Sequence, residues 1–350
     1  MIYSDQITNV LLHNGTTKNI LDIKTGDILI GPDSTPKHVK EYEIKQSSMV
    51  RVLNKKTESY YDIPDDSRIP FQLTNTSNKE KKGIRIKNTV YYSKDTVLLK
   101  YNEFLNSKKT HKHVLKMWSS PVIKFSEKNV DFPYFIGIWL GDGTSKRPGI
   151  TTMDDEVQEY ICYMAEIFNL KIKKYKKEET LAATYFLTTE NIKYCGKEYR
   201  NPILNLLKDN NLIENEHIPL KYLCSSIEDR RELLAGLIDT DGTYNKHRNY
   251  YSITQKRYNL ALDIFFLSKS LGFESSIHNY KGYYTVYIKG DIHEIPCRIR
   301  RKIPENTKNR KSSNRYAINI VNNIVGKCNY IKFEEECPLF LTGDFSVLSV

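Results

Sequence analysis

Apolar residues recur at every third or fourth position in several central stretches of the chain, which is the spacing of one buried helix face. These stretches are residues 133–140, 155–168, 230–238 and 259–271. Shorter runs rich in β-branched and aromatic residues predict strands between them. These runs are residues 171–177, 183–189, 250–255, 275–280 and 283–289. Asp131 precedes the first helix and can cap it, and Asp154-Asp155 opens the second.

The order of these elements repeats. A helix that ends in Asp-Gly, a strand, a second helix and two further strands occur between residues 131 and 189, and again between residues 230 and 289. Two copies are too few for a solenoid. We expect each copy to have the order helix–strand–strand–helix–strand–strand, and the two copies to pack about a pseudo-twofold axis to form a saddle. The first 60 residues instead predict short strands separated by turns such as Asn14-Gly15, a dipeptide suited to a tight hairpin.

Both copies carry a related motif at the end of their first helix. Residues 234–242 are LAGLIDTDG, and residues 135–143 are FIGIWLGDG. Gly137 and Gly141 have the GxxxG spacing, and Ala235-Gly236 supplies small residues in the other helix. Small side chains allow two helix backbones to approach closely. The carboxyl ends of the two helices would then meet.

Asp142 and Asp241 stand at those two helix ends. Two adjacent carboxylates repel each other unless a cation lies between them, and Mg²⁺ is the cation that suits hard oxygen ligands. The negative end of each helix dipole adds to the attraction. A metal ion held there can position a water molecule and stabilise the leaving oxygen in phosphodiester hydrolysis. The sequence therefore predicts Asp142 and Asp241 as metal ligands and catalytic residues.

Residues 234–242 are one substitution from the signature of the LAGLIDADG homing endonucleases, and the chain resembles that family across both copies. Residues 10–39 and 340–350 resemble the first and last parts of an intein's Hint self-splicing domain. Residues 288–302 are similar to the subfamily of the yeast vacuolar-ATPase intein and the mating-type switching endonuclease. The resemblance implies an α+β fold: a duplicated LAGLIDADG αββαββ saddle inserted in a mainly-β Hint-like domain.

The same resemblance implies domain boundaries and a function. The N-terminal Hint-like part with a DNA-contacting insert would span residues 1–128, the endonuclease 129–290 and the C-terminal Hint-like part 291–350. The implied function is a site-specific homing endonuclease that makes double-strand breaks by Mg²⁺-dependent phosphodiester hydrolysis. The alternative from another class is a sequence-specific DNA-binding protein with reduced or lost cleavage.

Splicing groups are missing at the positions that the resemblance assigns to them. The first intein position, which requires Cys or Ser, falls near Tyr3, and Ser4 is a nucleophile by residue type only. Residues 60–73 contain no His, and Ser349-Val350 stands in place of the terminal His-Asn pair. We expect a domain derived from an intein but unable to splice; an active intein is the remaining alternative.

At one position this chain departs from the family's pattern, because a cationic residue of the family is replaced by an acid. Family members often have Lys two residues before an Ile-Pro pair between the repeats, where this chain has Glu216. A carboxylate has the wrong sign to steady a scissile phosphate, so Glu216→Lys would speed cleavage of one strand unless Lys221 or another cation fills the role. In the second half, Lys302 is the catalytic candidate, and Arg301 is an equally fair match.

The net charge of +11 and the pI near 9.1 suit a polyanionic partner such as double-stranded DNA. Basic and aromatic residues follow both motifs, and further basic residues lie within the Hint-like insert and after the second repeat. These residue types can contact phosphates or base edges. The DNA-binding candidates are Lys146, Arg147, Lys246, Arg248, Tyr250, Lys256, Lys82, Arg85, Lys87, Lys109, Lys112, Arg298, Arg300 and Arg301.

The remaining expectations concern assembly and location. Both repeats lie in one chain, so we expect a monomer with internal pseudo-twofold symmetry. No apolar run is long enough to cross a bilayer, so no membrane partner is expected. Scattered cysteines without a CxxC pair are typical of reduced thiols in an intracellular protein, and a DNA substrate points to the nucleus.

Overall fold

The computed structural model describes residues 8–57, 59–74, 84–86, 89–92, 95–125, 128–176, 178–189, 201–305, 314–336 and 338–349. The chain forms two compact units, which are described separately. Unit 1 is discontinuous and consists of Met1–Phe125 and Ser313–Val350, whereas unit 2 is Ser126–Ser312. Among the described residues, no helix is long and apolar enough to span a membrane.

Unit 1 is built mainly of strands. Its elements before unit 2 are β1 (Asn9–Leu11), β2 (Thr17–Asn19), η1 (Ile20–Asp22), β3 (Ile28–Ile30), β4 (Pro36–Asn54), β5 (Tyr60–Pro64), β6 (Arg68–Leu73), β7 (Ile84–Ile86), β8 (Thr89–Tyr91), β9 (Thr96–Lys100), α1 (Tyr101–Leu105), α2 (Lys109–Val114) and β10 (Leu115–Trp118). Its elements after unit 2 are β18 (Arg315–Tyr316), β19 (Ile318–Phe333), β20 (Leu339–Leu341) and β21 (Val347–Ser349).

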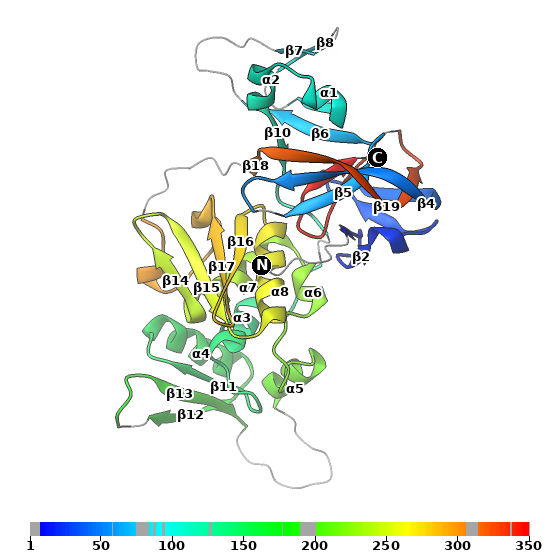
Figure 1. Ribbon diagram of the computed structural model, residues 1–350. Helices are drawn as coiled ribbons and strands as arrows, with labels where there is room; N and C mark the ends of the chain where they lie inside the picture. Colours follow the sequence, from blue (N-terminus) through cyan, green and yellow to red (C-terminus); the bar gives the residue numbers. More distant parts are fainter. Residues whose placement is uncertain are drawn as a thin grey trace. The chain divides into compact units, whose positions relative to one another are not determined.

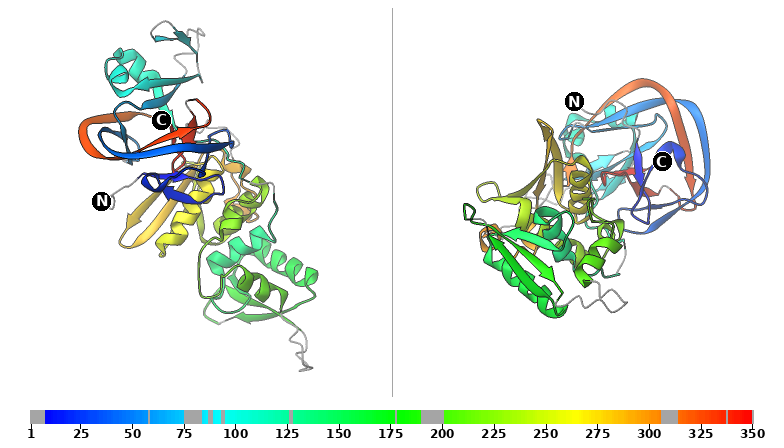
Figure 2. Two further views of the ribbon diagram at one scale, coloured as in Figure 1. Left: turned by 90° about the vertical axis from the view of Figure 1, so that its right-hand side faces the viewer. Right: turned by 90° about the horizontal axis from the view of Figure 1, so that it is seen from below.

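The two segments of unit 1 fold together through β4 and β19. These long strands pair antiparallel along nearly their whole length and curve together (Figure 1 and Figure 2). β3 and β5 join β4, and a separate sheet has the order β18-β10-β6-β9. The hairpin predicted at Asn14-Gly15 is confirmed, because β1 and β2 pair on either side of it and Gly15 has a φ of 84°. Unit 2 is therefore inserted into a domain whose two ends share sheets.

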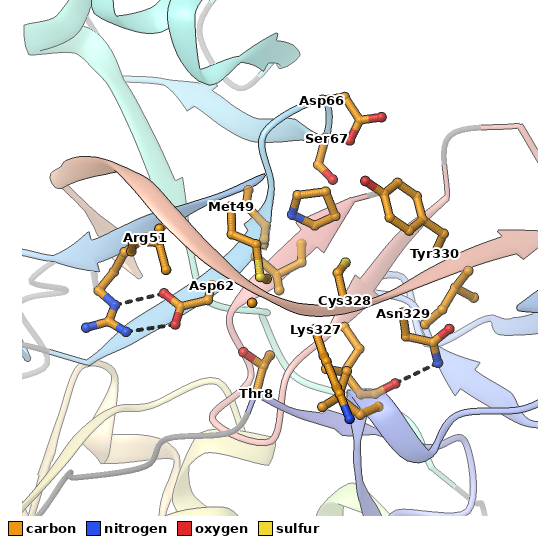
Figure 3. A pocket seen from close by; sticks show the side chains of 18 of the residues that line it. Thr8, Met49, Arg51, Asp62, Asp66, Ser67, Lys327, Cys328, Asn329 and Tyr330 are labelled. Carbon is orange, nitrogen blue, oxygen red and sulfur yellow. Dashed lines mark hydrogen bonds and ion pairs between the residues drawn. The ribbon is translucent and has the colours of Figure 1, made fainter. Parts of the chain in front are cut away.

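Unit 1 also contains a pocket with a volume of about 590 Å³. Figure 3 shows polar groups on two sides of it: Arg51 and Asp62 form an ion pair on one side, and Asn329 donates to the backbone on the other. The rest of its lining is largely apolar and includes Met49 and Cys328. All lining residues belong to unit 1, so Asp142 and Asp241 take no part in this pocket.

Unit 2 contains two similar successions of elements. The first is α3 (Pro133–Asp142), β11 (Gly149–Thr152), α4 (Asp155–Ile167), β12 (Lys171–Lys176) and β13 (Ala183–Thr188). The second is α7 (Ile227–Asp241), β14 (Gly242–Asn245), β15 (Tyr250–Gln255), α8 (Tyr258–Ser270), β16 (Glu274–Tyr280) and β17 (Tyr283–Lys289). Between them lie α5 (Pro202–Asp209) and α6 (Leu220–Leu223), and η2 (Ile292–Glu294) and η3 (Arg300–Lys302) follow.

The two sheets of unit 2 have matching orders, β11-β13-β12 and β14-β15-β17-β16. An isolated bridge between Gly143 and Ile150 stands in the first repeat where β14 pairs with β15 in the second. The predicted repeat of helices and strands is therefore confirmed, except that the first strand of the first copy is reduced to one bridge. Asp154 is the N-cap residue of α4, although its side chain makes no cap hydrogen bond, and the N-cap residue of α3 is Phe132 rather than Asp131.

The C-terminal limit of unit 2 lies beyond the second repeat. The sequence placed a boundary at 290/291, whereas the structure divides the units at 312/313. Ile292, Ile295 and Ile299 are buried in the same hydrophobic core as α3 and α7. Because these apolar side chains can lose contact with water only against the helices, the segment folds with unit 2.

Candidate active site at the ends of α3 and α7

α3 and α7 pack against each other with their backbones in direct contact (Figure 1). A Cβ on Gly137 would lie 2.9 Å from the Cα of Gly236 and would overlap the carbonyl oxygen of Leu233. A Cβ on Gly141 would overlap the side chain of Thr240 and lie 3.5 Å from the Cγ of Asp241. The predicted close approach through small residues is confirmed.

Asp142 and Asp241 are the last residues of α3 and α7. The glycines that follow them have extended, negative-φ backbones, so the Asp-Gly pairs are not left-handed caps. A Cβ on Gly143 would instead overlap the indole ring of Trp139, and one on Gly242 would overlap the backbone of Ile238. Glycine is required at both positions for space, because the chain turns back across the end of the preceding helix.

The charge of Asp241 acts on Asp142. Burial, and then the negative charge of Asp241, raise the pKa of Asp142 to about 6. Burial also raises the pKa of Asp241, while a hydrogen bond from Gln255 opposes the rise. The Gln255 Nε2 donates to Asp241 Oδ2 at 2.6 Å. Within the described part of the chain, Asp142 accepts no side-chain hydrogen bond of this kind.

Lys302, the catalytic candidate, is enclosed at the end of α7. Its side chain is buried, and the ammonium donates to the carbonyl oxygens of Ile238 at 2.7 Å, Asp239 at 2.8 Å and Thr240 at 3.1 Å. Burial lowers its pKa, and the nearby carboxylate of Asp239 opposes that change. Lys302 therefore satisfies the free carbonyls of the last turn of α7 and adds positive charge behind Asp241.

Asp239, which sequence reasoning missed, joins three segments beneath the site. Its buried carboxylate accepts hydrogen bonds from the Tyr134 hydroxyl at 2.7 Å and from the backbone N–H groups of Arg298 at 2.7 Å and Ile299 at 3.4 Å. It thereby connects α3, α7 and the segment that precedes Lys302. Burial and this carboxylate raise the pKa of the Tyr134 hydroxyl, which stays protonated as a donor.

Several predicted DNA-binding residues of unit 2 lie in exposed ion pairs. Lys146 pairs with Glu214 at 3.0 Å, and Lys246 pairs with Glu305 at 2.7 Å. Tyr250 packs edge-on against Tyr287 on a sheet surface. The exposed or partly exposed positions are Lys146, Arg147, Lys246, Arg248, Tyr250, Lys256, Arg300 and Arg301. Their role at DNA stays a prediction.

Arg298 has a different setting. Its guanidinium lies 3.9 Å from the ring centre of Tyr134 and 4.2 Å from that of Tyr160, and it pairs with Glu232 at 3.2 Å. These contacts hold the side chain against α3 and α4. Arg298 is thus engaged within unit 2, and the structure offers nothing that brings it to a substrate.

The predicted contacts in unit 1 are only partly described. Arg85 is exposed on β7 and Lys109 on α2, while Lys112 donates to the carbonyl oxygen of Leu105. Lys82 and Lys87 lie outside the described residues.

A divalent metal fits the two aspartates by donor chemistry. Asp142 and Asp241 offer carboxylate oxygens, and the unpartnered, partly buried Asp142 would be relieved by a cation. The described residues contain no group of three or more His, Cys, Asp or Glu able to hold a metal. Mg²⁺ commonly binds through one or two carboxylates and completes its shell with water and substrate phosphates, so two protein ligands suffice.

Residues 228–338 match the model of the LAGLIDADG-like domain family. The chain carries a LAGLIDADG-like domain. The match begins in α7, so it includes Asp241 and the second repeat. The first repeat, with Asp142, lies outside the matched residues and is tied to the domain by the α3–α7 contact.

Two curated relatives each match part of this chain. The replicative DNA helicase DnaB of Mycobacterium intracellulare is 34% identical over 142 residues, an alignment that covers 40% of this chain and 19% of the helicase. The homothallic switching endonuclease of Saccharomyces cerevisiae is 29% identical over 161 residues, covering 41% of this chain and 28% of the endonuclease. The chain thus spans less than a third of either relative, and the second relative agrees with the predicted mating-type switching resemblance.

Among solved structures, the homing endonuclease I-DmoI in complex with DNA and Mn aligns with 45% of this chain and 88% of that chain. The identity is 16% and the TM-score is 0.31, a likeness too low to transfer any property to this protein.

Sequence reasoning missed Gln255 and Arg257 near the site. Gln255 is the last residue of a strand that was predicted with its bounds, and Arg257 occupies the N-cap position of the next helix. The sequence did offer one signal for Gln255: a polar residue at the end of a strand that returns toward the motif helix. The periodicity does not show that this side chain reaches Asp241.

Proposed function

We propose that this protein is a site-specific DNA endonuclease that hydrolyses phosphodiester bonds with a divalent metal ion, Mg²⁺ in the simplest case. The observation that carries the proposal is the pair of partly buried carboxylates, Asp142 and Asp241, held at the touching ends of α3 and α7. Two repelling carboxylates at the ends of two helices are a costly arrangement without a cation. The LAGLIDADG-like domain and the similarity to a switching endonuclease support the same function.

Each group at the site has a distinct task in this proposal. Asp142 and Asp241 would hold the metal, which when bound would activate water and stabilise the leaving oxygen of the phosphodiester. Gln255 fixes the orientation of the Asp241 carboxylate by its hydrogen bond. Lys302 keeps the last turn of α7 in place, so that the carboxylate cannot move away from its partner.

The strands of both sheets would contact double-stranded DNA. Thr151 and Thr184 share a hydrogen bond on one sheet, and Thr254 and Thr285 share the corresponding bond on the other. Alternating side chains of an antiparallel sheet can enter the major groove and read base edges. The two repeats in one chain would cut both strands as a monomer, and we propose a nuclear location for a protein acting on chromosomal DNA.

Unit 1 would serve as a Hint-like scaffold that has lost protein splicing. Its two segments share sheets around the inserted unit 2, an arrangement suited to a domain interrupted by an endonuclease. The absence of His from residues 60–73 supports the loss of the acyl-shift chemistry. A fusion with reporter polypeptides at both ends tests this, since a ligated reporter product would contradict it.

The deciding experiment is selection of cleaved sites from a random or genomic DNA library by the purified protein in Mg²⁺, Mn²⁺ or chelator. We expect a recurring site cut on both strands only with metal, and no cut ends with an Asp142→Asn/Asp241→Asn variant. Asp209→Asn, an exposed aspartate at the end of α5, is the matched control and should cut normally. Site-specific binding without cut ends in any metal would instead establish the DNA-binding alternative.

A further inference from the structure

An arginine–carboxylate ion pair lies near each of the two central aspartates, close enough for the charge of Asp154 to act on Asp142 and that of Glu216 to act on Asp241. Near Asp142, the guanidinium of Arg301 makes two hydrogen bonds to Asp154, one of them at 3.0 Å. Near Asp241, Arg257 Nη1 lies 3.2 Å from Glu216 Oε2. The two repeats therefore place the same kind of pair at the site.

The members of the two pairs occupy corresponding positions with the charges exchanged. The bridge of Gly143 with Ile150 matches the pairing of Gly242 with Ile253, which aligns β11 with β15. After these strands, Asp154 is the N-cap of α4 and Arg257 is the N-cap of α8. One repeat thus has an acid where the other has a base.

The second member of each pair shows the opposite exchange. Glu216 precedes Ile218-Pro219 by the same spacing as Arg301 precedes Ile303-Pro304. Each half therefore keeps one arginine and one acid, although neither residue type is kept at either position. Exposed ion pairs stabilise proteins only weakly. Stability alone therefore gives little reason for both halves to keep such a pair, which points to another role.

Exposure distinguishes the arginines from the acids. The side chains of Arg257 and Arg301 are 52% and 57% exposed, whereas those of Glu216 and Asp154 are 36% and 13% exposed. The acids lie inward and hold the arginines, whose remaining N–H groups stay open to solvent. A planar guanidinium held in this way is suited to bind a phosphate through two N–H groups.

We propose that Arg257 and Arg301 are the two phosphate-contacting cations of the site, one for each half, oriented by Glu216 and Asp154. The proposal rests on the proposed endonuclease function and adds residues to it. Arg257 is then the other cation that compensates for Glu216, whereas Lys221 lies with its ammonium over the Tyr222 ring. Lys302, enclosed by three carbonyl groups, positions α7 and leaves phosphate contact to Arg301.

The test measures strand-resolved cleavage of an end-labelled duplex that the wild-type protein cuts. We expect Arg257→Ala to slow one strand and Arg301→Ala to slow the opposite strand, each by about 10–10²-fold. Arg231→Ala removes an arginine from another ion pair of unit 2, with Glu294, and should leave both rates unchanged. Equal slowing of both strands by Arg257→Ala, or no slowing, would overturn the proposal.

Exchanging charges separates positioning from general charge loss. Glu216→Arg alone should slow the strand that Arg257→Ala slows, by about tenfold, because it repels Arg257. Glu216→Arg with Arg257→Asp copies the arrangement of the first half and should restore that strand to within about threefold of the wild type. Arg257→Lys keeps the charge without the planar fork and should recover only part of the rate. If the double variant is no faster than Glu216→Arg, the exchanged pair has no such role.

Binding measurements distinguish failure of this proposal from failure of the endonuclease function. If wild-type protein binds DNA but cuts none in any metal, the endonuclease function fails. The slope of log affinity against log salt still reports phosphate contacts, and each Arg→Ala variant should lower its magnitude by about one. An unchanged slope in Arg257→Ala would overturn the phosphate contact whether or not the protein cuts.

Discussion

The two repeats of unit 2 share one succession of helices and strands, yet the ends of α3 and α7 have different surroundings. At the end of α7, Lys302 donates to three carbonyl groups and Gln255 donates to Asp241. The corresponding positions at the end of α3 are His217 and Thr152, and the Thr152 hydroxyl accepts from the backbone of Asp154 instead of donating to Asp142. One carboxylate is thus supported by its own half, and the other is not.

The residues that bring the two aspartates together are therefore different from the residues that set the charge around each of them. The helix contact brings the two aspartates together in the same way, because Gly137 and Gly236 lie at its centre. The residues that set the electrostatics of each aspartate come from strand ends and connecting segments, which are free to differ. We therefore expect both aspartates to be needed, but the properties of Asp142 to depend more on a bound cation.

The largest effect should come from removing either carboxylate. Asp142→Asn and Asp241→Asn should each lower double-strand cleavage by about 10³-fold or more, because the proposed metal site would lose one of its two protein ligands. DNA binding should stay within about tenfold, since phosphate contacts elsewhere supply most of the affinity. Plasmid cleavage and gel-shift titration measure the two quantities. Undiminished cutting by either variant would remove that aspartate from the site.

The next largest effect should be a loss of stability when Lys302 is replaced. Lys302→Met leaves three carbonyl oxygens of the last turn without their donor and should lower the free energy of unfolding by about 3 kcal/mol. Lys281→Met, at an exposed turn, should change it by less than about 0.5 kcal/mol. Denaturant unfolding followed by tryptophan fluorescence reports both. A Lys302→Met protein as stable as Lys281→Met would show that the last turn does not need this cap.

Gln255 offers a way to make the two halves more alike. Gln255→Leu removes the hydrogen bond that lowers the pKa of Asp241, so that pKa should rise. Because the ionised carboxylate is the form that binds a cation, the acid limb of the pH–rate profile should move to higher pH. The rate at neutral pH should fall by about tenfold. Gln158→Leu also removes a side-chain hydrogen bond in unit 2, which Gln158 accepts from the Tyr185 hydroxyl, and should leave the profile in place.

The smallest effect concerns the stability of the metal-free protein. The pKa of Asp142 is about 6 in the folded chain, above its ordinary value of 3.8, so the folded state holds a proton that the unfolded state releases. The stability linked to this proton is present at low pH and is lost as pH rises through 6. Asp142→Asn should therefore melt like the wild type below about pH 4, where the carboxyl group is protonated in both states, and about 2–4 °C higher at pH 7.5.

A divalent cation should cancel that difference. It neutralises the repulsion between Asp142 and Asp241 in the wild type, so the wild-type melting temperature should rise on adding Mg²⁺ at pH 7.5 more than that of Asp142→Asn. An equal shift in both proteins would place the cation elsewhere.

The amino-acid sequence by itself determined the elements of unit 2 and the meeting of its two motifs. The apolar spacing predicted α4 and α8 to within a residue or two, and the strand Tyr250–Gln255 with its bounds. The glycines of the motifs predicted the helix contact, because small residues at helical spacing allow two helix backbones to approach closely. These features are local, and they depend on residues close together in the chain.

Only the tertiary structure decided what surrounds each aspartate. Lys302 and Arg301 are adjacent in sequence, yet one is enclosed by carbonyl groups and the other extends to Asp154. Glu216 and Arg257 come from separate connecting segments, so no periodicity links them. Burial and ion pairing are set by residues distant in sequence, and the charge that a side chain presents at the site follows from those contacts rather than from its type.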